Sequence, residues 1–156
     1  MFPVSWWATF LTAMTPIGEL RAAIPLGIGV YHLSPVWVFV VAVLGNLIPV
    51  ILIYFLLGPL TNWLRRVNPM LDNFFAWLFK KTYHRHAANV DKYGSLALAL
   101  FVAIPLPITG GWTGALIAYV FGIKWQYAMP SLILGVITAG VIVTILTNLG
   151  LWAFSL

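Results

Sequence analysis

The sequence predicts an all-α integral membrane protein, built from two re-entrant helical hairpins and two long transmembrane helices in an inverted repeat. Of the 156 residues, 62% are hydrophobic and only 7% are charged, whereas ordinary globular domains carry about 25% charged residues. Two apolar stretches are long enough to cross a hydrocarbon core of ~30 Å, which takes about 20 helical residues. Two other apolar stretches are interrupted by proline and glycine, and their pieces are too short to cross.

The first interrupted stretch covers residues 4–30. It divides into Val4–Met14, a break around Pro16 and Gly18, and Leu20–Val30. Each piece is only about 10–12 residues long, which favours the two half-helices of a re-entrant hairpin over one full span. Pro25 is predicted to be a further break in this hairpin, because proline removes a helical hydrogen bond.

The first uninterrupted span is predicted over Pro35–Gly58. Asn46 and Pro49 lie inside it and indicate a kink, whose freed backbone groups need partners from neighbouring helices. With the first hairpin, this span makes up repeat one, residues 1–58, of a single membrane domain that covers residues 1–156. The chain is too short for a second domain.

A more polar linker is predicted over residues 59–93. Six of the eight basic residues of the chain, whose net charge is +5, fall between Arg65 and Lys92. Lysine and arginine collect in cytoplasmic loops, so this basic linker is expected to be cytoplasmic and close to anionic lipid head groups. Residues 70–82 predict an amphipathic helix on that interface, started by Pro69; a short cytosolic helix packed on its own chain is the alternative.

The second half of the chain repeats the pattern of the first. Residues 94–156 form repeat two, with an interrupted stretch that divides into Gly94–Ile104, a break over Pro105–Gly111, and Trp112–Gly122. Pro105 and Pro107 are the prolines of this break. The second uninterrupted span is predicted over Trp125–Leu149. Weak internal symmetry with Gly/Pro-interrupted segments at matching positions is typical of a transporter binding site.

The topology follows from how the interrupted stretches meet the membrane. If both are re-entrant, each half crosses once, the halves are inverted, and the two hairpin tips meet near the midplane. His32 then lies outside and Lys124 inside, which agrees with the collection of positive charge on the cytoplasmic side. If both stretches cross fully, the protein has four spans and both residues lie outside. The shortness of the pieces favours the re-entrant arrangement.

Glu19 and Arg21 are the charged residues of the first hairpin. An ionisable group at membrane depth costs roughly 2.5–3.5 kcal/mol on insertion scales, so its presence indicates function. Burial and a neighbouring guanidinium act on the pKa of a carboxyl group in opposite directions, so Glu19 is predicted to carry a proton or a cation. Arg21 is predicted to hold an anionic head group or carboxylate.

Structural roles are the alternatives for both residues. Glu19 can form an ion pair or cap a helix, and Arg21 can neutralise Glu19 or bind the carbonyl ends of the second hairpin. Residues at positions i and i+2 of a helix do not face each other. A direct contact between Glu19 and Arg21 therefore requires unwound backbone.

A second polar cluster lies at the break of the second hairpin. Its glycines permit close backbone approach, and the half-helix that follows offers free N–H groups to an anion; close packing of small residues is the alternative. Asn46 either lines the same cavity or bonds across helices, and Trp112 is expected to touch substrate. The predicted substrate or ion site therefore comprises Glu19, Arg21, Asn46, Thr109, Gly110, Gly111, Trp112 and Thr113.

Three segments carry a family resemblance: Gly18–Ile28 (GELRAAIPLGI), Gly45–Pro49 (GNLIP) and Phe101–Leu116 (FVAIPLPITGGWTGAL). They resemble the signature segments of the small multi-drug export proteins. That family is similar, more distantly, to the DedA-like or VTT-domain membrane proteins. The resemblance implies two re-entrant hairpins in inverted arrangement, and a role in moving drug-like molecules, phospholipids or polyprenyl phosphate. The arginine of the DedA-like second hairpin has no counterpart here, since residues 105–114 carry no charge.

The function predicted from these features is that of a membrane transporter. It would move a small amphipathic or anionic substrate by alternating access, with proton coupling through Glu19. A flippase or scramblase for anionic lipid is the first alternative, and a non-transport accessory protein is the second. The partners expected are membrane lipid, a small-molecule, drug-like or lipid substrate, and a second copy in a homodimer, in the plasma membrane.

Several other classes are not expected. Enzyme motifs for nucleotides, metalloproteases or serine hydrolases are missing from the sequence. His84–His86 has no carboxylate or thiol beside it, so no metal or cofactor is predicted. Because the basic residues sit in a membrane context, nucleic acid is not an expected partner. There is no cysteine, and hence no disulfide chemistry.

Overall fold

The computed structural model describes residues 3–67, 94–105 and 110–154, and every regular element in these ranges is helical. The predicted amphipathic helix over residues 70–82 and the basic turn at residues 84–86 lie outside the described residues. The elements, in chain order, are α1 (Val4–Met14), α2 (Glu19–Pro25), the π-helical turn η1 (Leu26–Val30), α3 (Pro35–Val67), α5 (Ser95–Ala103), α6 (Gly111–Val120) and α7 (Trp125–Phe154).

The short helices begin and end close to the predicted breaks. Helix α1 covers Val4–Met14, as predicted, and has 11 residues, while α5 has 9 and α6 has 10. At a rise of 1.5 Å per residue, each is roughly 14–17 Å long, about half of a hydrocarbon core. Proline and glycine end these helices because the one lacks an N–H group and the other has no side chain to hold the helical conformation.

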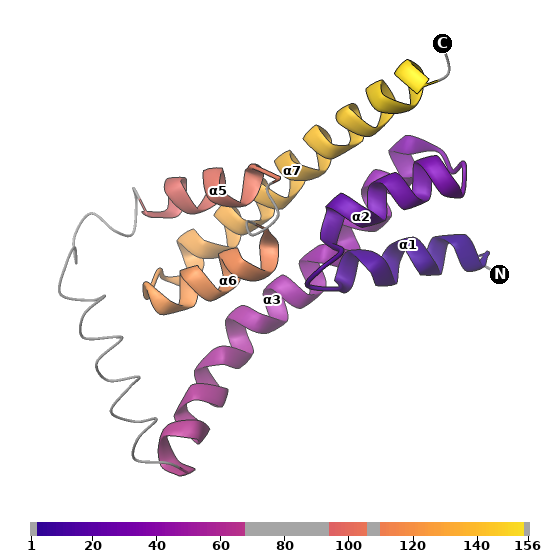
Figure 1. The fold of residues 1–156 in the computed structure, drawn as a ribbon. Coiled ribbons are helices and arrows are strands. Elements are labelled where there is room, and N and C mark those ends of the chain that lie inside the picture. Colours follow the sequence, from indigo (N-terminus) through magenta and orange to yellow (C-terminus); the bar gives the residue numbers. More distant parts are fainter. Residues whose placement is uncertain (1–2, 68–93, 106–109, 155–156) are drawn as a thin grey trace.

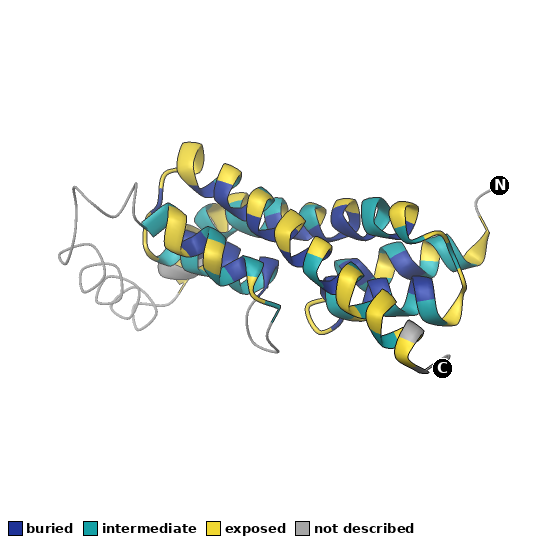
Figure 2. Cartoon of the chain, turned by 90° about the horizontal axis from the view of Figure 1, so that it is seen from above, coloured by how far each residue is buried: buried dark blue, intermediate teal, exposed yellow. Residues whose placement is uncertain are grey.

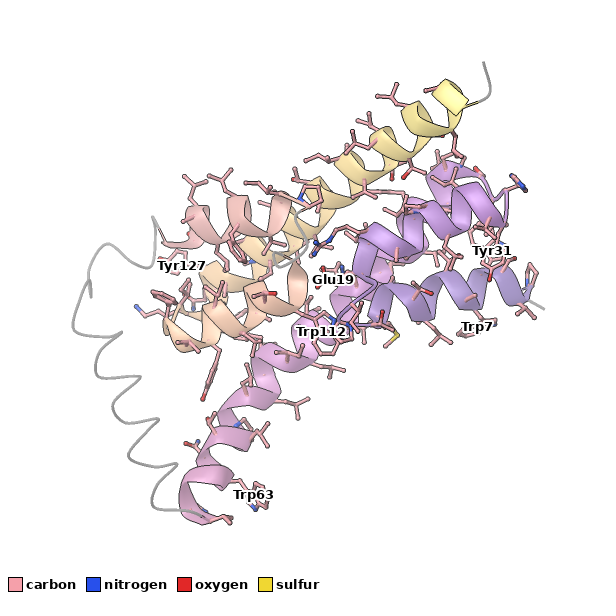
Figure 3. All side chains as sticks on the ribbon, viewed as in Figure 1. Trp7, Glu19, Tyr31, Trp63, Trp112 and Tyr127 are labelled. Atoms are coloured by element: carbon pink, nitrogen blue, oxygen red, sulfur yellow. The ribbon has the colours of Figure 1, made fainter. Side chains whose placement is uncertain are left out.

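The short helices form two hairpins whose turns meet in the middle of the molecule. Helix α1 packs against α2, and α5 packs against α6. Figure 1 shows that the two hairpins point toward each other from opposite ends, so that the turn between α1 and α2, the end of α5 and the start of α6 lie near the centre. The links from η1 to α3 and from α6 to α7 lie at opposite ends, marked by Tyr31 and Tyr127 in Figure 3.

Each hairpin packs closely against its own long helix at a glycine of that helix. Gly45 of α3 lies against α1, where an added Cβ would stand only 2.7 Å from the carbonyl oxygen of Phe10. Gly135 of α7 lies against α5, where a Cβ would stand 2.9 Å from the carbonyl oxygen of Ala99. These two glycines occupy corresponding contacts in the two halves.

The two long helices are apolar enough to cross a membrane over Pro35–Trp63 and Trp125–Leu151. Both run past the predicted ends: α3 continues beyond Gly58 to Val67, and α7 continues to Phe154. The predicted linker start at residue 59 falls within α3, whose last turns are residues 59–67. Pro59 lies inside this helix, and Thr61, two residues later, donates its hydroxyl to the carbonyl of Leu57 at 2.8 Å.

At Pro25, a predicted break of the first hairpin, the α-helix changes to a π-helix. Pro25 is the last residue of α2, and the chain continues directly into the π-helical turn η1. The N–H of Tyr31 donates to the carbonyl of Leu26 at 3.1 Å, five residues earlier. A wider turn of this kind accommodates an irregularity in a helix without ending it.

Apolar side chains lie on both the inside and the outside of this bundle. Figure 2 shows buried residues on the faces that the helices turn toward one another and exposed residues on the outer faces. The exposed residues include large apolar side chains along both long helices, such as Leu52, Phe55, Leu134 and Ile145. An outer surface of this composition suits contact with lipid chains rather than water.

The two glycine contacts predict a matched pair of destabilised variants. Gly45→Ala and Gly135→Ala should each lower the free energy of unfolding by about 1–3 kcal/mol, because the added methyl group meets backbone that cannot move away. Thermal unfolding of the detergent-solubilised protein measures the effect. Gly150→Ala is the control, since nothing lies within 4 Å of a Cβ there. Equal stability of all three variants would contradict the packing described.

Candidate functional site

The turn of the first hairpin places Glu19 in an unusual backbone conformation. Gly18 donates its N–H to the hydroxyl of Thr15 at 3.0 Å, which closes the turn after α1. Glu19 follows with a φ of 44°, in the left-handed region that costs a non-glycine residue of order 1–3 kcal/mol. Such conformations cluster at sites where a side chain must point in one particular direction. Here the carboxylate points away from its own hairpin.

The carboxylate of Glu19 lies at the N-terminus of α6. The N–H of Trp112 donates to Oε1 of Glu19 at 3.3 Å, and the N–H of Gly111 is bonded to the same carboxylate. The first N–H groups of a helix have no partner within the helix, and a negative charge there is also favoured by the helix dipole. Glu19 therefore caps a helix that lies 93 residues away in the sequence, and Figure 3 shows it between the two hairpin turns.

Gly110 makes this approach possible. A Cβ at Gly110 would overlap the carboxylate of Glu19, so any larger residue would push the two hairpins apart. We expected glycine to permit a close approach at this break, and Gly110 lies against the carboxylate of Glu19. The turn of the second hairpin meets a side chain of the first.

Arg21 completes the charged part of the site. Its guanidinium lies 3.3 Å from Oε2 of Glu19, with 27% of the Arg21 side chain and 6% of the Glu19 side chain exposed. This contact between residues two apart satisfies the requirement for unwound backbone, because Glu19 has the left-handed conformation just described. The carboxylate of Glu19 therefore accepts hydrogen bonds from the guanidinium of Arg21 as well as from the backbone at the start of α6.

A small cavity lies beside the carboxylate. It has about 10 Å³, which is about the room that one water molecule needs. Its walls come from both hairpins and both long helices, and include Glu19, Arg21, Asn46, Pro105, Gly110, Gly111 and residues of α7. Asn46 lines this cavity, which is the first of the two roles predicted for it. Asn46 is only 1% exposed, and its Oδ1 has no hydrogen-bond partner among the described residues.

A larger groove opens on the other side of Arg21. It has about 440 Å³ and is lined by Arg21, Pro25, Gly29, Pro105, Val143, Leu146, Thr147, Gly150 and Leu151. The groove and the small cavity share Arg21, Pro105 and Val143. Its volume falls in the range of ligand pockets, about 300–1,000 Å³. Apart from Arg21, none of these residues carries a charge.

The remaining predicted residues are placed differently. The backbone of Trp112 contacts Glu19, but its ring lines a separate apolar groove on α3 with Pro49 and Leu52, so the structure does not bring the ring into the cavity. Thr113 is half-buried in the first turn of α6 and is not one of the described residues that line the cavity. Pro107 and Thr109 lie outside the described residues.

The sequence reading missed the wall that α7 contributes. Val136, Ala139 and Val143 line the cavity, and Thr147 lines the groove. These residues belong to an uninterrupted apolar span, where a functional face has no charge to mark it. Their spacing of three and four residues is the only signal that places them on one face of the helix.

The comparison with protein families decides what this chain is related to. A family model described as "Putative small multi-drug export protein" matches residues 19–142. The chain belongs to this family. The match to the small multi-drug export family begins at Glu19 and includes every described residue that lines the small cavity except Val143. Together with the two long apolar helices, membership makes this a membrane protein. No curated protein and no solved structure matches the chain.

The capping role of Glu19 predicts different effects for two substitutions. Glu19→Ala should lower the free energy of unfolding by about 1–2 kcal/mol, because α6 loses its cap. Glu19→Gln should lower it less, since the amide oxygen can still accept from Trp112. Thermal unfolding in detergent compares the two. Equal losses for both variants would mean that the charge, rather than the cap, carries the stabilisation.

Proposed function

We propose that this chain is a membrane transporter that moves a small amphipathic or anionic molecule by alternating access. In this proposal the chain does not act as an enzyme on its substrate. In this proposal the two hairpins are re-entrant, enter from opposite faces of the plasma membrane, and form a DedA-like inverted repeat. We further propose a homodimer in the same membrane, because each hairpin leaves polar backbone that a neighbouring subunit can cover.

The arrangement of the helices supports the proposed topology. The short helices are about half as long as a hydrocarbon core, and their turns meet at the centre of the molecule (Figure 1). The link that contains His32 and the link that contains Lys124 lie at opposite ends. With Lys124 and the basic linker on the cytoplasmic side, the charges obey the positive-inside rule.

The single observation that carries the proposal is the contact between Glu19 and α6. It is a charge-dependent bond from one hairpin to the other, made at the depth where the hairpins meet. A proton on Glu19 removes the charge that holds both Arg21 and the α6 N-terminus, and so weakens this bond. Protonation can then be linked to movement of one half against the other, as alternating access requires.

The substrate in this proposal binds at Arg21, from the larger groove. The guanidinium is partly exposed and provides the charge that an anionic group needs, while the groove walls are apolar. An amphipathic anion fits both features. Because Arg21 also contacts Glu19, the substrate anion and the Glu19 carboxylate compete for one guanidinium. A proton on Glu19 favours the substrate in this competition, which is a route to coupling between them.

The proposed coupling is tested by transport in liposomes. Glu19→Gln should abolish the pH dependence of transport and lower its rate at least about tenfold, equivalent to about 1.4 kcal/mol in the barrier, with folding retained. Uptake of a fluorescent amphipathic anion at several pH values measures this. Unchanged transport in Glu19→Gln would rule out the proton role.

A lipid flippase or scramblase is the second candidate function. The observation that favours it is the groove of about 440 Å³, which is apolar and ends at Arg21. The same liposomes, with a labelled anionic phospholipid in place of the soluble anion, separate the two candidates. Flipping that ignores pH and is lost in Arg21→Gln supports the lipid path, whereas absence of flipping leaves the soluble anion as substrate.

The proposed topology is tested with single cysteines. Because the chain has no cysteine of its own, His32→Cys and Lys124→Cys each carry one reactive thiol. A membrane-impermeant reagent should label the first from outside intact cells, and the second only after the membrane is opened. Labelling of both from the same face would contradict the re-entrant arrangement.

A further inference from the structure

Asn46 is a buried polar residue to which neither the family match nor the transport proposal gives a role. It lies within α3, which belongs to neither hairpin, and 1% of its surface is exposed. Its Oδ1 has no hydrogen-bond partner among the described residues. A buried acceptor without a donor is unfavourable, and more so at membrane depth, where no bulk water can supply the missing bond.

The missing donor has a natural source across the cavity. Asn46 and Glu19 line the same cavity, which has room for about one water molecule. Gly111 keeps Asn46 close to the hairpin turn, because a Cβ at Gly111 would stand 3.0 Å from Oδ1 of Asn46. Asn46 therefore lies directly against the first residue of α6, where the Glu19 carboxylate is bound.

The bonds around Glu19 depend on its charge. As a carboxylate it accepts from Arg21 and from the backbone of Gly111 and Trp112, and it has no hydrogen to donate. As a carboxylic acid it has one O–H group, which needs an acceptor. The groups that hold the charged form are all donors, so none of them can accept from the acid.

We propose that Asn46 is the acceptor for the proton that Glu19 binds. On protonation, one oxygen of Glu19 leaves Arg21 and donates its O–H to Oδ1 of Asn46. Protonation thus replaces the contact between Glu19 and Arg21 by a hydrogen bond from Glu19 to Asn46 of α3. The guanidinium of Arg21 then becomes available to an anion. Among the described residues that line the cavity, Arg21 of α2 is the charged group that faces Glu19; those from α3, α5, α6 and α7 are uncharged.

This inference rests on the proposed proton role of Glu19 and names its partner. It makes Asn46 a positioning residue for the protonated state, which acts on the substrate through Glu19 and Arg21. A residue that only packed against the hairpin turn would not change the pH at which Glu19 takes up its proton. The pH of half-protonation is therefore the measurement that separates the two roles.

The composition of the chain allows this measurement at one residue. Glu19 is the sole glutamate in the sequence, so glutamate labelled with carbon-13 at the side-chain carboxyl reports Glu19 alone. Infrared or NMR spectra of the full chain in liposomes, recorded across a pH series, give the pH of half-protonation. Asn46→Leu keeps the size of the side chain and removes the acceptor; Asn46→Val, which is smaller, replaces it if the leucine variant does not fold.

The expected result is half-protonation of Glu19 at a pH about one unit lower in Asn46→Leu than in the unaltered protein, because the acid form loses its acceptor. Thr61→Val is the control, since it removes a buried hydroxyl from the same helix about 22 Å away along its axis, and it should leave the titration unchanged. Asn46→Thr, which retains an oxygen acceptor, should restore part of the shift.

Three other outcomes overturn the inference. An unchanged titration in Asn46→Leu would leave Asn46 a packing residue, and a shift to higher pH would mean that its NH₂ group faces the carboxylate instead. In both cases the proton role of Glu19 survives, because the label still titrates. If the label shows no change of protonation in the unaltered protein, the proton role itself fails, and the role of Asn46 with it.

Discussion

The contact between a carboxylate in one hairpin and the N-terminus of a helix in the other is the interaction on which the rest of this structure depends. Each hairpin turn leaves backbone groups without helical partners at a depth where water is scarce. The Glu19 carboxylate, from the other half of the molecule, accepts hydrogen bonds from the N–H groups of Gly111 and Trp112 at the start of α6. Directing its side chain to this position requires the unfavourable left-handed backbone conformation of Glu19.

Because a charge makes this contact, the joining of the two halves responds to any ligand that changes the charge. A proton neutralises the carboxylate, and an anion at Arg21 draws away one of its partners. The small cavity and the larger groove meet at Arg21, so both ligands would act within one short stretch of the molecule. A covalent or purely apolar junction would hold the halves together equally well, but it would not respond to either ligand.

The sequence predicted the local features of this site and missed its long-range ones. Helix α1 ends at Met14 and α6 begins at Gly111 close to the prediction, because proline and glycine act on the backbone within a turn of their own position. A helix cap is one of the roles that the sequence predicts for Glu19, but the sequence names neither the helix nor the bonded N–H groups. Proline marks an interruption in the sequence but does not show that the chain stays helical beyond it, as it does after Pro25 and through Pro59. The α7 wall was missed because its residues carry no distinguishing chemistry.

The two glycine contacts limit where this molecule can bend. Gly45 brings α1 and α3 so close that a carbonyl oxygen of one helix fills the place of a side chain on the other, and Gly135 does the same for α5 and α7. Interfaces this tight slide or open only by losing their packing. Each hairpin and its long helix should therefore behave as one stiff unit, and within the described residues we expect movement at the seam between the two units. That seam runs through the carboxylate of Glu19.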